Sequence, residues 1–148
     1  MKVIIQKVAA YITCENQLLV FTHVDYPQAG IQVPAGTVAE EESLDDAVLR
    51  EAFEETGLPN LQIKSTLGTR IYDLPSVEGR DNVIHRHYYH LKLSAPIKIH
   101  RWQHWEKSPS EGALEPILFE LFWVSLTEEI PELSGELGDL LNDLITDN

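Results

Sequence analysis

Three glutamates lie close together near the end of a segment with helical periodicity. Glu51, Glu54 and Glu55 are three and four residues apart, so they share one face of the predicted helix. Like charges at this spacing each destabilise a helix by about 0.2 to 0.5 kcal/mol. Carboxylate oxygens are, however, the ligands that Mg²⁺ and Mn²⁺ prefer. The spacing therefore predicts a divalent-cation site whose open positions would take water and phosphate oxygens.

Arg50 supplies only part of the compensating charge. It stands beside Glu51 and four residues before Glu54, and one guanidinium against three carboxylates leaves the group negative. A solvated acidic surface is the usual interpretation of a charge run. It fits poorly here, because Leu49 and Phe53 lie on the opposite face and predict a helix that packs on both sides.

The predicted helix has recognisable ends. Ser43, followed three residues later by Asp46, is typical of an N-terminal cap. Gly57 stands where a left-handed residue would end the helix. Between these ends, the glutamates continue the apolar face on which Leu44 and Val48 lie.

The residues from Gly36 to Leu58, GTVAEEESLDDAVLREAFEETGL, resemble the Nudix box. Gly36, Glu42 and the run from Arg50 to Leu58 stand at the spacing of that motif. One position departs from it, because Ala52 replaces a larger aliphatic residue and so affects packing but no ligand. The resemblance covers positions 36 to 58 of the 148 residues, and its many fixed positions make it specific.

This resemblance implies hydrolysis of a diphosphate linkage in a nucleoside diphosphate derivative, such as a nucleoside triphosphate, a nucleotide sugar or ADP-ribose. Mg²⁺ would be the cofactor, with Mn²⁺ as a substitute. Arg50 would orient Glu51, and Glu42 would support the site from the first helical turn. The implied metal ligands are the backbone carbonyl of Gly36 and the carboxylates of Glu51, Glu54 and Glu55.

The general base varies within the family, and a glutamate outside the box sometimes serves. Glu106, Glu111 and Glu115 are the candidates, and the residues alone do not choose between them. The family also contains non-catalytic nucleotide-sensing or partner-binding modules on the same fold. Such modules usually lack box glutamates, and this chain keeps them, which favours the enzyme.

Charge is distributed unevenly along the chain. The net charge of -13 argues against nucleic-acid polymers as partners, because their binding depends on basic residues that neutralise phosphates. Eight of the eleven basic residues lie between positions 64 and 107. A diphosphate would be repelled by the acidic helix, so we expect at least one of Arg70, Arg80 and Arg86 to bind the phosphates of a small nucleotide substrate.

Length and composition are ordinary for one globular domain, with 148 residues, 43% hydrophobic and 24% charged. Cys14 is the single cysteine, which excludes an internal disulfide and is typical of the cytosol. The first apolar residues are interrupted by Gln6 and Lys7, which predicts neither a signal peptide nor a membrane span. We therefore expect a cytoplasmic protein with no membrane partner.

The remaining pattern predicts strands over 2–13, 17–23, 61–72, 83–93 and 117–125, a short run over 31–33, and a final helix around 135–145. Gly68 marks a predicted bulge, and connections fall at 73–82 and 94–116. Strands and helices in this order predict an α+β fold. The resemblance to the Nudix family implies a mixed sheet between helices in a single domain, 1–148.

Two aromatic residues and two histidines leave alternatives open. Trp102 and Trp105 would stack a nucleobase, anchor a homodimer or form a local core. His85 and His87 share one face of a strand, as zinc ligands can. No third ligand accompanies them at metal-site spacing, so we expect them to line a cleft or to pack in its wall.

Overall fold

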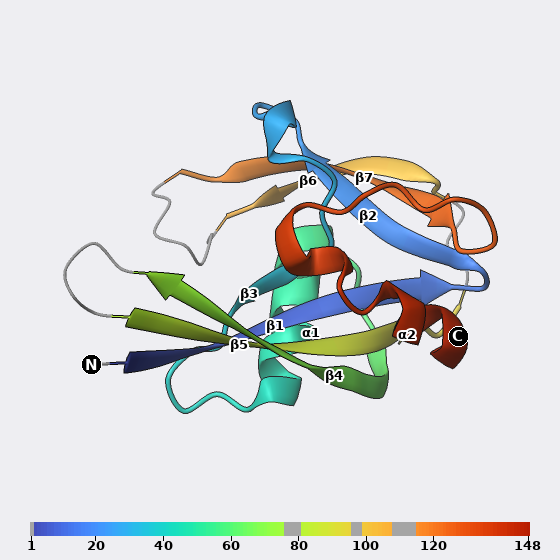
Figure 1. Cartoon of the computed structure of the whole chain (residues 1–148). Coiled ribbons are helices and arrows are strands. Elements are labelled where there is room, and N and C mark those ends of the chain that lie inside the picture. The colour runs from blue at the N-terminus through green and yellow to red at the C-terminus, as the bar shows by residue number, and fades with distance from the viewer. Residues whose placement is uncertain (1, 76–80, 96–98, 108–114) are drawn as a thin grey trace.

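A mixed β-sheet is the centre of the fold, in a computed structural model that describes residues 2–75, 81–95, 99–107 and 115–148. The strand order is β4-β5-β1-β2-β7-β6, and β3 pairs with β1 (Figure 1). The strands are β1 (Lys2–Cys14), β2 (Gln17–His23), β3 (Ala35–Thr37), β4 (Leu61–Pro75), β5 (Asp81–Leu93), β6 (Arg101–Glu106) and β7 (Ile117–Ser125).

Strand pairing divides this sheet into two halves. β1 and β5 are parallel, and β5 and β4 are antiparallel. β2, β7 and β6 form the other half, in which all pairs are antiparallel. β1 and β2 pair only beside their hairpin, at Thr13 with Leu18 and at Cys14 with Gln17, and β3 takes the place beside β1 further along. The half-sheets therefore separate away from the hairpin, as Figure 1 shows.

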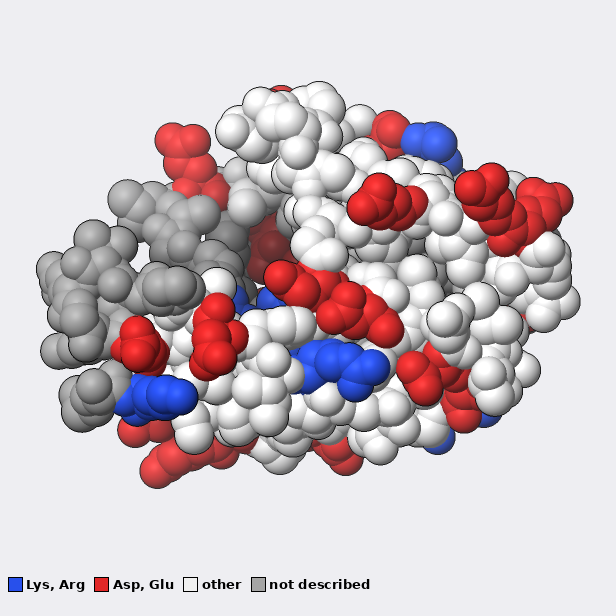
Figure 2. Space-filling view, in the orientation of Figure 1, with Lys and Arg blue, Asp and Glu red and all other residues white. Residues whose placement is uncertain are grey.

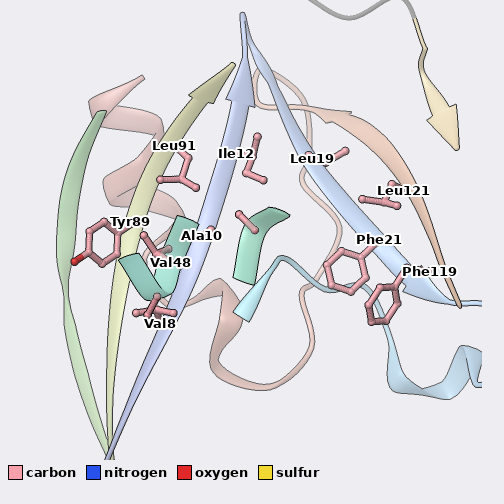
Figure 3. Close-up of a cluster of buried hydrophobic side chains, with 12 residues drawn as sticks. Val8, Ala10, Ile12, Leu19, Phe21, Val48, Tyr89, Leu91, Phe119 and Leu121 are labelled. Atoms are coloured by element: carbon pink, nitrogen blue, oxygen red, sulfur yellow. The ribbon is translucent and has the colours of Figure 1, made fainter. Parts of the chain in front are cut away.

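Alternate residues of β1 enter two different cores. Val8, Ala10 and Ile12 pack with helix α1 (Leu44–Thr56), in the cluster drawn in Figure 3. Ala9 and Tyr11 face the other side, where the 3₁₀ helix η2 (Gly135–Gly138) and helix α2 (Leu141–Asp147) cover the sheet. A further 3₁₀ turn, η1 (Pro27–Ala29), follows β2. The expected mixed sheet between helices is thus confirmed.

Both predicted ends of α1 are confirmed. The Ser43 hydroxyl accepts a hydrogen bond from the Asp46 amide at 3.1 Å, and Gly57 ends the helix in the left-handed region with φ 75°. The prediction that the helix packs on both sides is wrong. Leu49 packs against the core, but Phe53 is 55% exposed and lines an open pocket with His104 and Trp105 of β6.

Two predicted connections are shorter than expected. The connection 73–82 loses both ends to pairing, because β4 runs on to Pro75 and β5 begins at Asp81. The connection 94–116 contains β6, which the expected strands omit. Gly68 does lie at a predicted irregularity, since the register between β4 and β5 shifts between Thr66 and Gly68.

The predicted final helix is divided in two. Gly135 has φ 55° and begins the 3₁₀ turn η2, and α2 starts only at Leu141. Glycine is a weak helix former, and the Tyr11 hydroxyl binds the carbonyl of Leu137 and the amide of Leu140 where the two pieces meet. Within the described part of the chain, no helix is long and apolar enough to cross a membrane.

Helix α2 offers a test of how the C-terminal segment is held. Leu144 is fully buried and the adjacent Ile145 is 45% exposed. We expect Leu144→Ala to lower the free energy of unfolding by about 2 to 5 kcal/mol, because it leaves a cavity in the second core. Ile145→Ala should change it by less than about 0.5 kcal/mol. Urea denaturation measures both, and equal effects would contradict this packing.

Candidate active site

The backbone of Gly36 lies directly against the carboxylate of Glu51. β3 pairs Gly36 with Val8 of β1, which fixes this backbone beside α1. A Cβ atom at position 36 would lie 2.2 Å from Cδ of Glu51, far closer than two carbon atoms can approach. Glycine is therefore needed here to let the carboxylate approach the chain.

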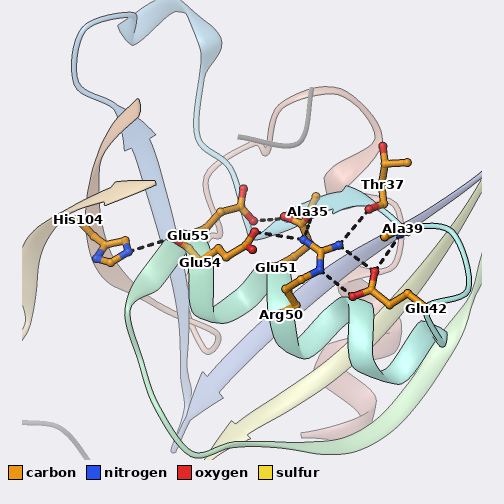
Figure 4. A network of polar contacts seen from close by, with 9 residues as sticks. All are labelled: Ala35, Thr37, Ala39, Glu42, Arg50, Glu51, Glu54, Glu55 and His104. Carbon is orange, nitrogen blue, oxygen red and sulfur yellow. Dashed lines mark hydrogen bonds and ion pairs between the residues drawn. The ribbon is translucent and has the colours of Figure 1, made fainter. Parts of the chain in front are cut away.

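Arg50 binds the acids around it through most of its donors, as Figure 4 shows. Its Nε and one terminal nitrogen donate to the two carboxylate oxygens of Glu42 at 2.7 and 3.0 Å. The other terminal nitrogen donates to Glu51 at 3.0 Å and to Glu54 at 3.2 Å. These hydrogen bonds lower the pKa of Glu42 and give each carboxylate a fixed direction.

Glu106 joins the two helix glutamates from a different part of the sheet. One ligand oxygen from each of Glu51, Glu54 and Glu106 lies within 4.8 Å of the others. Glu106 is the last residue of β6 and is only 4% exposed. Burial, with the nearby charge of Glu54, raises the pKa of Glu106 to about 7.

Glu51 and Glu55 are both buried on α1 but have different partners. Burial raises the pKa of Glu51 to about 7, although Arg50 opposes the shift. Burial and the Glu106 charge raise the pKa of Glu55 well above its usual range. Glu55 accepts a hydrogen bond from the Ala35 amide at 3.0 Å. It lies outside the group of three close carboxylates found among the described residues.

A divalent cation fits the chemistry of this group. Oε2 of Glu51 is buried and has no hydrogen-bond partner among the described residues, although a buried carboxylate oxygen normally has one. Three carboxylate oxygens within 4.8 Å of one another repel each other until protons or a cation neutralise them. Hard oxygen ligands of this kind suit Mg²⁺ or Mn²⁺.

A cavity of about 380 Å³ opens beside the carboxylates. Figure 2 shows a hollow with acidic atoms deep inside it and basic atoms at its lower edge. Gly36, Glu55 and Glu106 line one side of the cavity, and Lys7 of β1 and Arg86 of β5 contribute the positive charge. Nε of Arg86 is buried without a hydrogen-bond partner among the described residues.

Of the three expected phosphate-binding arginines, only Arg86 lines this cavity among the described residues. Arg70 lies exposed on β4, and Arg80 falls outside the described residues. Among the candidate bases, Glu106 lies in the carboxylate group, Glu115 is exposed, and Glu111 falls outside the described residues.

The sequence also left the positions of Trp102, Trp105 and His87 open. Trp102 is half-buried against the first core and Trp105 is 49% exposed. His87 lies between Gln6 and Thr69, at 2.7 Å and 3.0 Å. Sequence reasoning did not single out Lys7 as a cavity residue, because a lysine in a strand carries no motif.

Comparison with known proteins decides the family. The family model described as the NUDIX domain matches residues 5–143, which is most of the chain. The chain belongs to the NUDIX domain family. Nudix hydrolases are pyrophosphohydrolases that act on nucleoside diphosphate derivatives and use divalent metals, so the carboxylate group and the adjoining cavity are the candidate active site of a Nudix hydrolase.

Solved structures show the same Nudix fold. A MutT protein from Methanosarcina mazei has a TM-score of 0.62 and 22% identity, covering 95% of this chain and 92% of its own. A UDP-X diphosphatase has a TM-score of 0.63 and 15% identity, covering 97% and 62%. An ADP-ribose pyrophosphatase from Streptococcus suis has a TM-score of 0.59 and 15% identity, covering 96% and 90%.

A curated relative is similar over a shorter stretch. The low-salt glycan biosynthesis protein Agl8 from Haloferax volcanii is 47% identical over 58 residues, which is 38% of this Nudix chain. The stretch makes up 35% of Agl8, so the similarity spans about a third of that relative's length.

The raised pKa values of Glu51 and Glu106 predict a pH-dependent response to metal. Because both are raised from 4.5 to about 7, the folded protein holds protons there that the unfolded chain releases. Without metal, this contribution to stability is complete below about pH 4.5 and is lost as the pH rises through about 7. A divalent cation held by these carboxylates would take the place of the protons.

The expected result is that Mg²⁺ raises Tm more at about pH 8 than at about pH 5.5. Differential scanning fluorimetry with and without Mg²⁺ measures this. An equal rise at both pH values would contradict metal binding at the buried carboxylates.

Proposed function

We propose that this Nudix chain hydrolyses a nucleoside diphosphate derivative at its diphosphate linkage, with Mg²⁺ bound by Glu51, Glu54 and Glu106. The observation that carries this proposal is the position of the three carboxylates, which lie within 4.8 Å of one another beside a cavity of about 380 Å³. Negative groups bind the cation, and the positive groups of the cavity offset the charge of a substrate phosphate.

A cation held by Glu51, Glu54 and Glu106 would supply neutralising charge for the phosphate oxygens and would make the attacking water more acidic. The chain's own residues then have separate roles. Arg50 holds the carboxylates of Glu51 and Glu54 in place. Glu106 receives no hydrogen bond from Arg50 among those described, so its carboxylate oxygens stay open to accept a proton. Its pKa of about 7 suits it to accept the proton of the attacking water.

Gly36 and Glu55 complete the proposed site. The Gly36 backbone touches the Glu51 carboxylate, which supports its carbonyl as a further metal ligand. Glu55 accepts a hydrogen bond at 3.0 Å from the amide of Ala35, the residue just before Gly36. We assign two roles to Glu55. It supports the backbone beside Gly36, and it would add negative charge around a bound metal.

Arg86 is the proposed phosphate-binding residue. It comes from β5, lines the cavity and lies with its guanidinium carbon 5.9 Å from the centre of the Tyr72 ring. This contact favours one direction of the side chain. The unpartnered Nε suits an acceptor oxygen brought by a ligand.

Within the family's range of substrates, we propose nucleotide sugars as the first class to test. A glycan biosynthesis protein is the curated relative with 47% identity over the matched stretch, and this supports nucleotide sugars as the first compounds to test. ADP-ribose and nucleoside triphosphates follow. A panel of these compounds with Mg²⁺, in which released phosphate or nucleoside monophosphate is measured, identifies the substrate.

The alternative is a nucleotide-sensing module without catalysis. The geometry gives it less support, because Arg50 holds Glu51 and Glu54 beside Glu106 as a complete acidic group. A nucleotide that raises Tm but is recovered intact after long incubation with Mg²⁺ and Mn²⁺ would favour the sensor.

Glu54→Gln tests the metal-dependent reaction. The amide has a similar shape but binds a hard cation poorly, so we expect kcat to fall at least about 100-fold. Glu40→Gln is the matched control, because Glu40 is exposed and lies outside the carboxylate group. Both variants are assayed at saturating Mg²⁺ with the best compound of the panel. Most of the activity persisting in Glu54→Gln would exclude Glu54 as a ligand.

Arg86→Ala tests the phosphate contact. An arginine bound to a phosphate contributes about 1.5 to 3 kcal/mol, so KM should rise about tenfold or more. Arg70→Ala removes the same charge from an exposed position of β4 and should leave KM within about twofold. Steady-state kinetics compares the two variants, and the same KM in both would show that Arg86 does not bind the phosphates.

A further inference from the structure

One face of strand β6 meets helix α1 at three alternate positions. Trp102, His104 and Glu106 alternate along β6 and are more buried than their neighbours Gln103 and Trp105. Residues at every second position of a strand share one face. Glu106 thus belongs to a row in which two other side chains also reach the helix.

The two other side chains bind backbone carbonyls at the end of α1. The indole N–H of Trp102 donates to the carbonyl of Thr56 at 3.0 Å. Nε2 of His104 lies 2.9 Å from the carbonyl of Glu54 (Figure 4). A carbonyl oxygen only accepts, so Nε2 is the donor of this hydrogen bond. Both residues donate to groups that the helix cannot satisfy itself.

These hydrogen bonds meet a need of the helix end. The last four carbonyls of a helix have no partner within it, and the last turn of α1 contains no basic residue that would bind them. Gly57 makes room for one donor, because a Cβ there would lie 2.8 Å from Nδ1 of His104. The imidazole therefore occupies the space that a side chain at position 57 would take.

The hydrogen bonds of Trp102 and His104 also bear on the position of Glu106, which lies on the same strand. β6 is an edge strand that pairs only with β7 in the described sheet, so β7 alone does not fix its distance from α1. His104 binds the backbone of Glu54, and the carboxylate of Glu54 lies in the group that Glu106 completes. Glu54 thus contacts β6 in two ways. Its backbone carbonyl binds His104, and its carboxylate lies near that of Glu106.

We propose that Trp102 and His104 are positioning residues that hold Glu106 at metal-binding distance from Glu51 and Glu54. The inference rests on the proposed metal site and adds to it a reason why the third carboxylate comes from β6. The hydrogen bonds act through the spacing of β6 and α1, and neither side chain is a ligand itself. Residues behind metal ligands typically change metal affinity about 10 to 100-fold.

The test measures Mn²⁺ binding by the full chain without substrate, from the free Mn²⁺ signal in electron paramagnetic resonance. Trp102→Phe removes the indole N–H, and His104→Leu removes the imidazole donor. Each should weaken Mn²⁺ binding about tenfold. Trp105→Phe is the matched control, because Trp105 is exposed on the same strand. His104→Gln keeps an N–H donor. The Mn²⁺ affinities of Trp105→Phe and His104→Gln should both stay within about twofold of the wild type.

A double-mutant cycle distinguishes positioning from general stability. If Trp102 and His104 act through Glu106, neither Trp102→Phe nor His104→Leu should weaken Mn²⁺ binding further in a Glu106→Gln background. A loss of the same size in that background would overturn the proposal. So would wild-type affinity in both single variants.

Folding and activity are measured beside Mn²⁺ affinity, so that a weaker affinity can be assigned to its cause. Circular dichroism shows whether each variant folds, and His104→Leu against His104→Gln carries the test if Trp102→Phe does not fold. A wild type that binds no Mn²⁺ would overturn the metal site and this inference together. A wild type that binds Mn²⁺ but hydrolyses none of the panel would overturn the proposed activity and leave the positioning test intact.

Discussion

The guanidinium of Arg50 binds three separate pieces of the chain at once. It donates to Glu42 before the helix, to Glu51 and Glu54 on the helix, and to the carbonyl of Thr37 at the end of β3. These bonds allow a buried carboxylate to lie against the Gly36 backbone, where an unpaired charge would be costly. This one side chain thus ties the loop before α1 and the end of β3 to the acids of the helix.

Residues close in the chain made much of this arrangement predictable. The ends of α1 followed from Ser43 and Gly57, because a capping hydroxyl and a left-handed glycine act on the adjacent backbone. The spacing of Arg50 and the glutamates on one helix likewise placed them on a shared face. Periodicity was informative wherever a residue and its partner lie within one or two turns of the same element.

Long-range placement was harder to predict. Glu106 could be named only as one of three candidates, because its distance from Glu51 depends on where the edge strand β6 lies, and that strand has a short, mostly polar sequence. Alternation of Trp102, His104 and Glu106 was the available signal for β6. Phe53 shows the opposite limit, since its helical phase was clear but nothing local indicated that its side chain stays 55% exposed.

Tyr72 and Tyr88 join the C-terminal segment to the sheet beside the cavity. The Tyr88 hydroxyl lies 2.6 Å from that of Tyr72 and donates to the carbonyl of Glu136 at 2.5 Å. Tyr72 also donates to Asp139 at 3.1 Å. Because Glu136 lines the cavity, these hydroxyls hold the cavity wall in place. The wall is thus built by polar contacts from β4 and β5, although it packs over an apolar core.

The short pairing between β1 and β2 has a consequence for how such a protein diversifies. Only two residue pairs join β1 and β2 at the hairpin. Beyond it, Gln32 bonds to Phe21 of β2 and the carbonyl of Pro34 accepts from Ala10 of β1. Helix α1 packs on side chains from both halves, and His23 of β2 and Phe119 of β7 also line the cavity. Glu106, the third carboxylate of the proposed site, lies on β6 and so belongs to the same half as β2 and β7. Substitutions that shift this half to reshape the pocket therefore also move a proposed metal ligand. Diversification of the pocket and retention of the metal site are thus coupled through the second half-sheet.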